Sequence, residues 1–80
     1  PHPRIFTDAL DALQVSPAEA LFVGDSPYDD IVGARQVGMD IAWVNAFDAP
    51  LPENIPVPEY TVRAIPELRH ILSISGTERA

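Results

Sequence analysis

Apolar residues recur at helical spacing in three parts of the chain. The first part predicts a helix over residues 3–15, whose buried face should consist of Ile5, Phe6, Ala9, Leu10 and Leu13. A second helix is predicted over 26–37, with Ser26 as its N-cap and Gly38 as a left-handed stop. The last is predicted over 65–74, and it should bury Ile65, Leu68, Ile71 and Leu72.

Short apolar runs separate these helices. Residues 20–23 and 41–44 are continuously apolar, which is typical of strands buried on both faces of a parallel sheet. Residues 60–62 predict a third, shorter strand, and the proline-rich stretch 47–58 predicts an extended surface loop. This order of elements predicts an α/β fold, a three-layer Rossmann-like parallel sheet with helices on both faces.

Composition narrows the possible functions. The chain has 80 residues, which is one small domain or a piece of a larger one, and it begins Pro1-His2-Pro3, which we interpret as truncation. A net charge of −7 argues against nucleic-acid binding, since phosphates would be repelled. We expect no membrane segment, because no apolar run is long enough and no signal-peptide pattern is present. The absence of cysteine suits a reducing compartment, so a cytoplasmic location is expected.

Three aspartates gather where a ligand would bind in such a fold. Asp25 follows the first predicted strand, and Asp29 and Asp30 lie at the start of the next helix. In open parallel sheets, ligands bind beyond the carboxyl ends of the strands. Oxygen ligands of this kind suit Mg²⁺. A structural alternative exists for Asp29, which can complete a capping box with Ser26, whereas a carboxylate at the position of Asp25 needs a partner.

The residues from Val23 to Ala34, followed by Val37-Gly38-Met39, resemble the fourth conserved motif of haloacid dehalogenase-like (HAD) hydrolases. Matching residue by residue places the first acid of that motif on Asp25 and the second on Asp30. In relatives with shorter spacing the second acid would be Asp29, which otherwise takes the capping role. The segment 1–6 is similar to the residues that follow the third-motif Lys, and that Lys itself is missing.

The resemblance implies that residues 1–74 are the C-terminal part of a HAD-like catalytic core and that 75–80 are a polar tail. It implies a Mg²⁺-dependent hydrolase of small phosphate monoesters that acts through an aspartyl-phosphate, with a small phosphorylated metabolite as its partner. The nucleophilic Asp, the general acid and the Lys would lie upstream, so the fragment alone should be inactive and weakly stable. Asp25 and Asp30 would hold Mg²⁺, and the candidates for the substrate side are Ser26, Tyr28 and Asn45.

Two other functions remain open at this point. One is a non-catalytic phosphate- or metal-binding module, or a degenerate HAD-like domain. The other is a metal-independent 2-haloacid dehalogenase, although Gly24-Asp25-Ser26 favours a phosphatase. Among the other residues, Trp43 is predicted to lie in the core with its indole N–H satisfied locally. His70 and the arginines Arg35 and Arg63 are predicted to be solvated.

Overall fold

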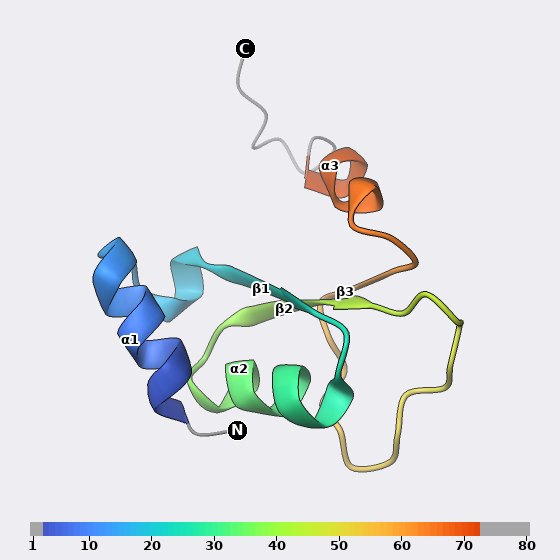
Figure 1. Ribbon diagram of the computed structural model, residues 1–80, viewed down its shortest axis with the longest axis horizontal. Helices are drawn as coiled ribbons and strands as arrows, with labels where there is room; N and C mark the ends of the chain where they lie inside the picture. The colour runs from blue at the N-terminus through green and yellow to red at the C-terminus, as the bar shows by residue number, and fades with distance from the viewer. Residues whose placement is uncertain (1–2, 73–80) are drawn as a thin grey trace.

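The computed structural model describes residues 3–72, apart from the side chains of His70 and Leu72. The elements follow the predicted order (Figure 1). They are α1 (Pro3–Leu13), η1 (Pro17–Glu19), β1 (Leu21–Gly24), η2 (Pro27–Ile31), α2 (Val32–Gln36), β2 (Asp40–Val44), β3 (Tyr60–Val62) and α3 (Pro66–Leu72). The end of the last predicted helix, the boundary predicted at residue 75 and the segment before Pro3 lie outside the described residues.

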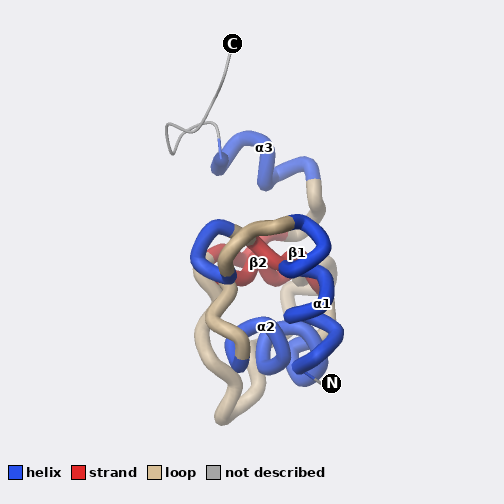
Figure 2. The backbone as a smooth tube through the Cα atoms, turned by 90° about the vertical axis from the view of Figure 1, so that its left-hand side faces the viewer, coloured by secondary structure: helices blue, strands red, loops and turns tan. Residues whose placement is uncertain are grey.

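The three strands form one parallel sheet in the order β1-β2-β3. Leu21 pairs with Asp40 and Ala42 pairs with Tyr60, so the carboxyl ends of the strands lie at a common edge. Figure 2 shows α1 and α2 on one side of the sheet and α3 on the other. The predicted α/β class with helices on both faces is therefore confirmed.

The central strand divides the core between these two faces. Ile41 and Trp43 belong to the cluster that includes Phe6 and Leu10 of α1, whereas Ala42 packs with residues of β3 and α3. Alternate side chains of a strand point to opposite faces. The unbroken apolar run 41–44 thus supplies both cores at once, as its composition predicts.

The prediction that β1 is buried on both faces is wrong for this chain. Leu21 and Phe22 are half-buried and Val23 is 38% exposed, whereas the middle of β2 is buried. The reason is position, since β1 is an edge strand of the described sheet and has a neighbour on one side only.

The buried faces predicted for the first and last helices are too wide. In α1, Phe6 and Leu10 are buried, but Ile5 and Leu13 are 67% and 70% exposed, and Ala9 is exposed too. Beyond the edge strand β1, the described chain provides nothing to cover this side of α1. Ile65, just before α3, is also 62% exposed, while Leu68 is buried as predicted.

The prediction that Arg35 is solvated is wrong as well. Its guanidinium makes two parallel hydrogen bonds to the Glu59 carboxylate, at 2.9 and 3.0 Å, and a third to the carbonyl of Val57. Glu59 in turn accepts the N–H of Ile41 at 2.8 Å. The hydrogen bond from Arg35 is the main cause that lowers the pKa of Glu59. Through these hydrogen bonds, Arg35 and Glu59 connect the end of the proline-rich loop to α2 and β2.

Arg63 stays exposed, as predicted, and makes an ion pair with Asp48 at 3.5 Å. Within residues 3–72, no helix combines the length and the apolarity that a bilayer crossing needs.

Candidate active site at the carboxyl end of the sheet

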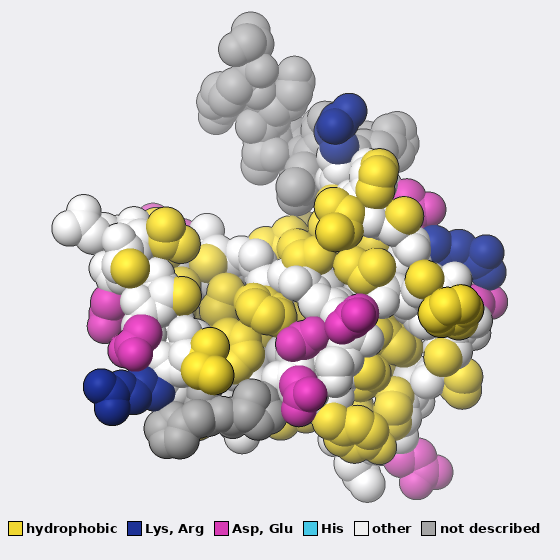
Figure 3. Space-filling view, in the orientation of Figure 1, with side chains coloured by type: hydrophobic (Ala, Val, Ile, Leu, Met, Phe, Trp, Pro, Cys, Tyr) yellow, Lys and Arg dark blue, Asp and Glu magenta, His cyan; other side chains and the backbone are white. Residues whose placement is uncertain are grey.

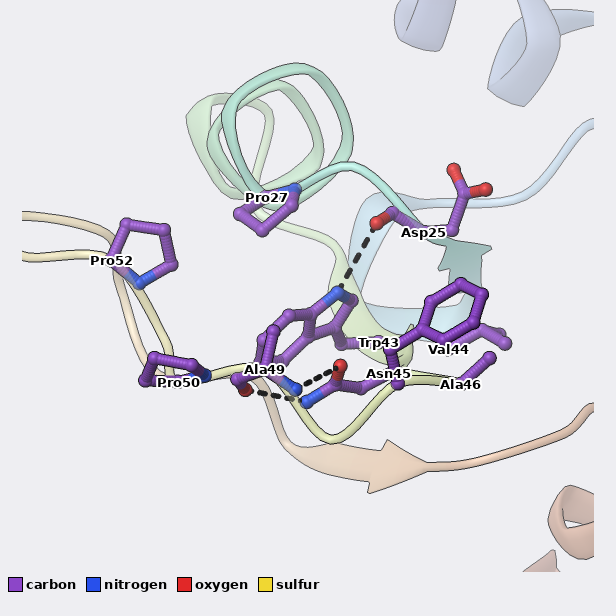
Figure 4. Close-up of a pocket in the computed structure, with 10 residues that line it drawn as sticks. Asp25, Pro27, Trp43, Val44, Asn45, Ala46, Ala49, Pro50 and Pro52 are labelled. Carbon is purple, nitrogen blue, oxygen red and sulfur yellow. Dashed lines mark hydrogen bonds between the residues drawn. The ribbon is translucent and has the colours of Figure 1, made fainter.

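Asp25 is held at the end of β1 by its backbone. The indole N–H of Trp43, on the neighbouring strand, donates to the carbonyl oxygen of Asp25 at 3.3 Å. Trp43 itself is only 5% exposed, which confirms that it is a core residue with a locally satisfied N–H. Figure 4 shows the Asp25 carboxylate pointing away from Trp43, so the hydrogen bond fixes the backbone and leaves the carboxylate available.

The turn after Asp25 opens as a π-helix rather than an α-helix. Ser26 is its N-cap, and the Ser26 hydroxyl accepts the N–H of Asp29 at 3.3 Å. The N–H of Ser26 donates to the Asp30 carboxylate at 3.0 Å, so Asp30 makes the reciprocal capping contact that was predicted for Asp29. In the wider π turn the acceptor for Ser26 lies four residues along the chain instead of three.

Gly24 makes room for the Asp30 carboxylate. A Cβ atom built at Gly24 would lie 2.2 Å from Asp30 Oδ2 and 2.7 Å from Asp30 Cβ. Contacts of that length are not tolerated, so any larger residue would displace the carboxylate. Gly24, which precedes Asp25, therefore allows β1 and η2 to lie close together.

Asp25 and Asp30 line the same pocket at the carboxyl end of β1. The pocket has a volume of about 400 Å³, and its other walls are Phe22, Val23, Gly24, Val44 and Ile65. In the space-filling view, carboxylates gather in the middle of this face beside apolar side chains (Figure 3). Asp29 is exposed and does not line the pocket, so it is Asp30 that the fold brings to the pocket of Asp25.

The chemistry of this pair suits a hard cation. Two carboxylates offer the oxygen ligands that Mg²⁺ prefers, and Mg²⁺ typically retains several waters besides one or two carboxylates. Within the described residues, no group of three or more His, Cys, Asp or Glu side chains is arranged to hold a metal ion by itself. Asp25 and Asp30 therefore fit part of a magnesium site, to be completed by water, phosphate or further ligands.

The three candidates for the substrate side occupy different surroundings. Ser26 is half-buried and its hydroxyl is engaged with Asp29. Tyr28 is 62% exposed and does not line the pocket that contains Asp25 and Asp30. Asn45 is 9% exposed, and its side-chain amide makes two hydrogen bonds to the backbone of Ala49, at 2.8 and 2.9 Å. Asn45 thus shapes the loop that follows β2.

A second pocket, also of about 400 Å³, shares Asp25 with the first and lies against that loop (Figure 4). Phe47 is among its lining residues and is 94% exposed, although the sequence pattern did not single it out. The available signal was a large aromatic residue just after the end of a strand, in a loop predicted to be solvated.

The profile of HAD-hydrolase-like proteins matches residues 1–67. The chain belongs to this family. The HAD resemblance predicted from the motif around Asp25 is therefore confirmed, and so is the Rossmann-like fold.

Relatives of this HAD-like chain include phosphatases and dehalogenases. A glyceraldehyde 3-phosphate phosphatase from Pyrococcus furiosus is 40% identical over 78 residues, which cover 98% of this chain and 32% of the relative. The crystal structure of a 2-haloacid dehalogenase from Pseudomonas syringae pv. Tomato superposes with a TM-score of 0.83 at 32% identity, covering 91% of this chain and 31% of that one.

A third relative is the HAD-hydrolase YfnB of Bacillus subtilis, whose crystal structure is bound to magnesium. It has a TM-score of 0.79 at 33% identity, covering 89% of this chain and 31% of that one. The chain thus spans about a third of the length of each of these relatives.

Proposed function

We propose that this chain is the metal-binding part of a HAD phosphatase that hydrolyses small phosphate monoesters with the help of Mg²⁺. The observation that carries the proposal is the convergence of Asp25 and Asp30 on one pocket at the carboxyl end of β1. That edge of a parallel sheet is where ligands bind. The phosphatase name of the Pyrococcus furiosus relative and the magnesium of the Bacillus subtilis hydrolase support the same function.

In this proposal, an aspartate upstream of the segment attacks phosphorus and becomes an aspartyl-phosphate while the ester P–O bond breaks. A second upstream aspartate gives a proton to the departing alkoxide, and water then hydrolyses the aspartyl-phosphate to inorganic phosphate. Bound Mg²⁺ would offset the repulsion between the carboxylate nucleophile and the phosphate dianion. Asp25 and Asp30 would hold that cation, directly or through water, while Trp43 fixes the backbone of Asp25.

The setting proposed for this activity follows from composition. The absence of cysteine supports a reducing, cytoplasmic location, and the net charge of −7 supports a small phosphorylated metabolite rather than nucleic acid as the partner. An acidic surface repels a phosphate ester unless a cation lies between them, which is consistent with a metal-dependent reaction.

The test is phosphate release by the full-length protein from a panel of small phosphate esters, with Mg²⁺ and with EDTA. Asp25→Asn removes one ligand charge while keeping the side-chain volume, so kcat/KM should fall more than about 100-fold. Asp11→Asn is the matched control, because Asp11 is exposed on α1, away from the pocket, and its substitution should leave kcat/KM within about twofold. Equal losses in the two variants would contradict a metal role for Asp25.

A 2-haloacid dehalogenase is the second candidate, since the Pseudomonas syringae enzyme has a closely similar fold. Its activity would need no metal. Halide release from 2-chloropropionate that persists in EDTA, together with the absence of phosphate release from any ester, would favour the dehalogenase. The absence of both reactions would favour a non-catalytic or degenerate module.

A further inference from the structure

The pocket against the loop after β2 has no assigned role in the proposed chemistry. Its lining residues include Pro27, Trp43, Asn45, Phe47, Pro50 and Pro52, besides Asp25. It therefore adjoins the pocket of Asp25 and Asp30 through two shared residues, Asp25 and Val44, and lies at the same carboxyl edge of the sheet. Its volume of about 400 Å³ falls within the usual range for small-molecule sites.

The polar side chains of this pocket are already occupied. The Trp43 indole N–H donates to the carbonyl of Asp25, and the Asn45 amide is bonded at both ends to Ala49 (Figure 4). The Asp25 carboxylate points away from Trp43, toward the other side of the strand end. What the side chains here offer a ligand is therefore apolar surface, made of proline rings, alanine methyl groups and Phe47.

The exposure of Phe47 is extreme for an aromatic side chain. Phe47 is 94% exposed, whereas Trp43 in the same pocket is 5% exposed. Single exposed apolar residues are common on protein surfaces and mean little alone. Phe47 differs because it lines a pocket whose other side chains are mostly apolar and which shares Asp25 with the pocket of Asp30.

We infer that this pocket receives the organic part of the phosphate ester and that Phe47 selects apolar or planar leaving groups. This inference rests on the proposed phosphatase function, which places the phosphoryl group beside Asp25. A polyhydroxylated leaving group would gain little here, because its hydroxyls would meet no free side-chain donor. An aromatic or alkyl group would be removed from water against Phe47 and the prolines.

The test compares two esters whose leaving groups are both simple alcohols, benzyl phosphate and glycerol 3-phosphate, in the full-length protein with Mg²⁺. Phe47→Ala should lower kcat/KM for benzyl phosphate about tenfold, the equivalent of about 1.4 kcal/mol, and change that for glycerol 3-phosphate less than twofold. Val57→Ala is the control, because Val57 is a 75% exposed apolar residue of the same loop outside the pocket. Val57→Ala should leave kcat/KM unchanged for both esters.

Each other outcome has a definite meaning. Equal losses for the two esters in Phe47→Ala, with a lower melting temperature, would show that Phe47 packs against another part of the protein and would overturn the inference. If the wild type hydrolyses no ester, the proposed function fails. Binding of the non-hydrolysable probe benzylphosphonate then tests separately whether the pocket holds an aromatic group. Saturation-transfer NMR that detects the benzyl ring on the wild type and not on Phe47→Ala would support the pocket, and no contact with the wild type would overturn it.

Discussion

Gly24 and Asp30 depend on each other at the scale of single residues. The glycine lets the Asp30 carboxylate reach the N–H of Ser26 at 3.0 Å, which also brings that carboxylate to the pocket of Asp25. If Asp25 and Asp30 hold Mg²⁺ as proposed, small changes at Gly24 should act on that cation through Asp30, although Gly24 has no side chain of its own.

Gly24→Ala should destabilise the protein by about 1–3 kcal/mol and weaken its Mg²⁺ response about tenfold or more, because the new methyl group displaces Asp30. Thermal melting and the Mg²⁺ concentration for half-maximal activity measure the two effects. Gly38→Ala is the control, since Gly38 has a φ of +86° but a Cβ there would make only an ordinary van der Waals contact, with Pro17 Cβ at 3.7 Å.

In the control, the left-handed backbone alone should lower stability, by about 1–2 kcal/mol, without altering the Mg²⁺ requirement. An unchanged Mg²⁺ requirement in Gly24→Ala would show that Mg²⁺ binding does not depend on the present position of Asp30.

At the scale of elements, the ion pair between Arg35 and Glu59 joins α2, the proline-rich loop and the start of β2. The two side chains are 32% and 33% exposed, and Glu59 also accepts the N–H of Ile41. Because Arg35 lowers the pKa of Glu59 from 4.5, the folded state is stabilised by the ionised carboxylate above pH 4.5. That contribution is lost as the pH falls through the lowered, folded-state pKa.

Glu59→Gln should therefore lower the melting temperature at pH 7, by the equivalent of about 0.5–1 kcal/mol for a partly solvated pair. The difference from the wild type should shrink as the pH is lowered through 4.5. Glu53→Gln makes the same charge change at an exposed residue of the same loop and should show little difference at either pH. A constant gap between wild type and Glu59→Gln from pH 7 to pH 3 would contradict this role for Glu59.

At the scale of the whole molecule, the chain covers about a third of the length of its relatives and leaves β1 at the edge of the sheet. A groove of about 250 Å³ runs between α1 and β1, lined by apolar residues that include Ile5, Leu13 and Phe22. Unpaired backbone and exposed apolar side chains along one strand are a stability and aggregation liability. We propose that a strand outside these 80 residues covers them.

The 80 residues made alone should therefore unfold broadly and at low temperature, and they should release no phosphate from any ester. Circular-dichroism melting and sedimentation at two concentrations would measure stability and self-association together. A sharp cooperative transition of the monomer, with the stability of a complete domain, would show that β1 needs no partner.

The sequence by itself determined the order of elements, the parallel α/β class and the position of the aspartates after the first strand. It did so because apolar runs, helical spacing and local caps are properties of neighbouring residues, and Ser26 and Gly38 act within one turn. Trp43 was placed correctly for the same reason, since a large aromatic in a central strand has to be buried.

Motif matching favoured Asp30 over Asp29 as the second acid, and the tertiary structure provides the physical reason why Asp30 joins Asp25. Asp29 and Asp30 differ by a rotation about the helix axis, and only the π turn together with the space over Gly24 directs Asp30 into the pocket. Tertiary structure alone decided the pairing of Arg35 with Glu59, which are far apart in sequence, and the exposure of β1. The pairing of Arg35 with Glu59 and the exposure of β1 depend on contacts between distant segments, and no local pattern of residues encodes them.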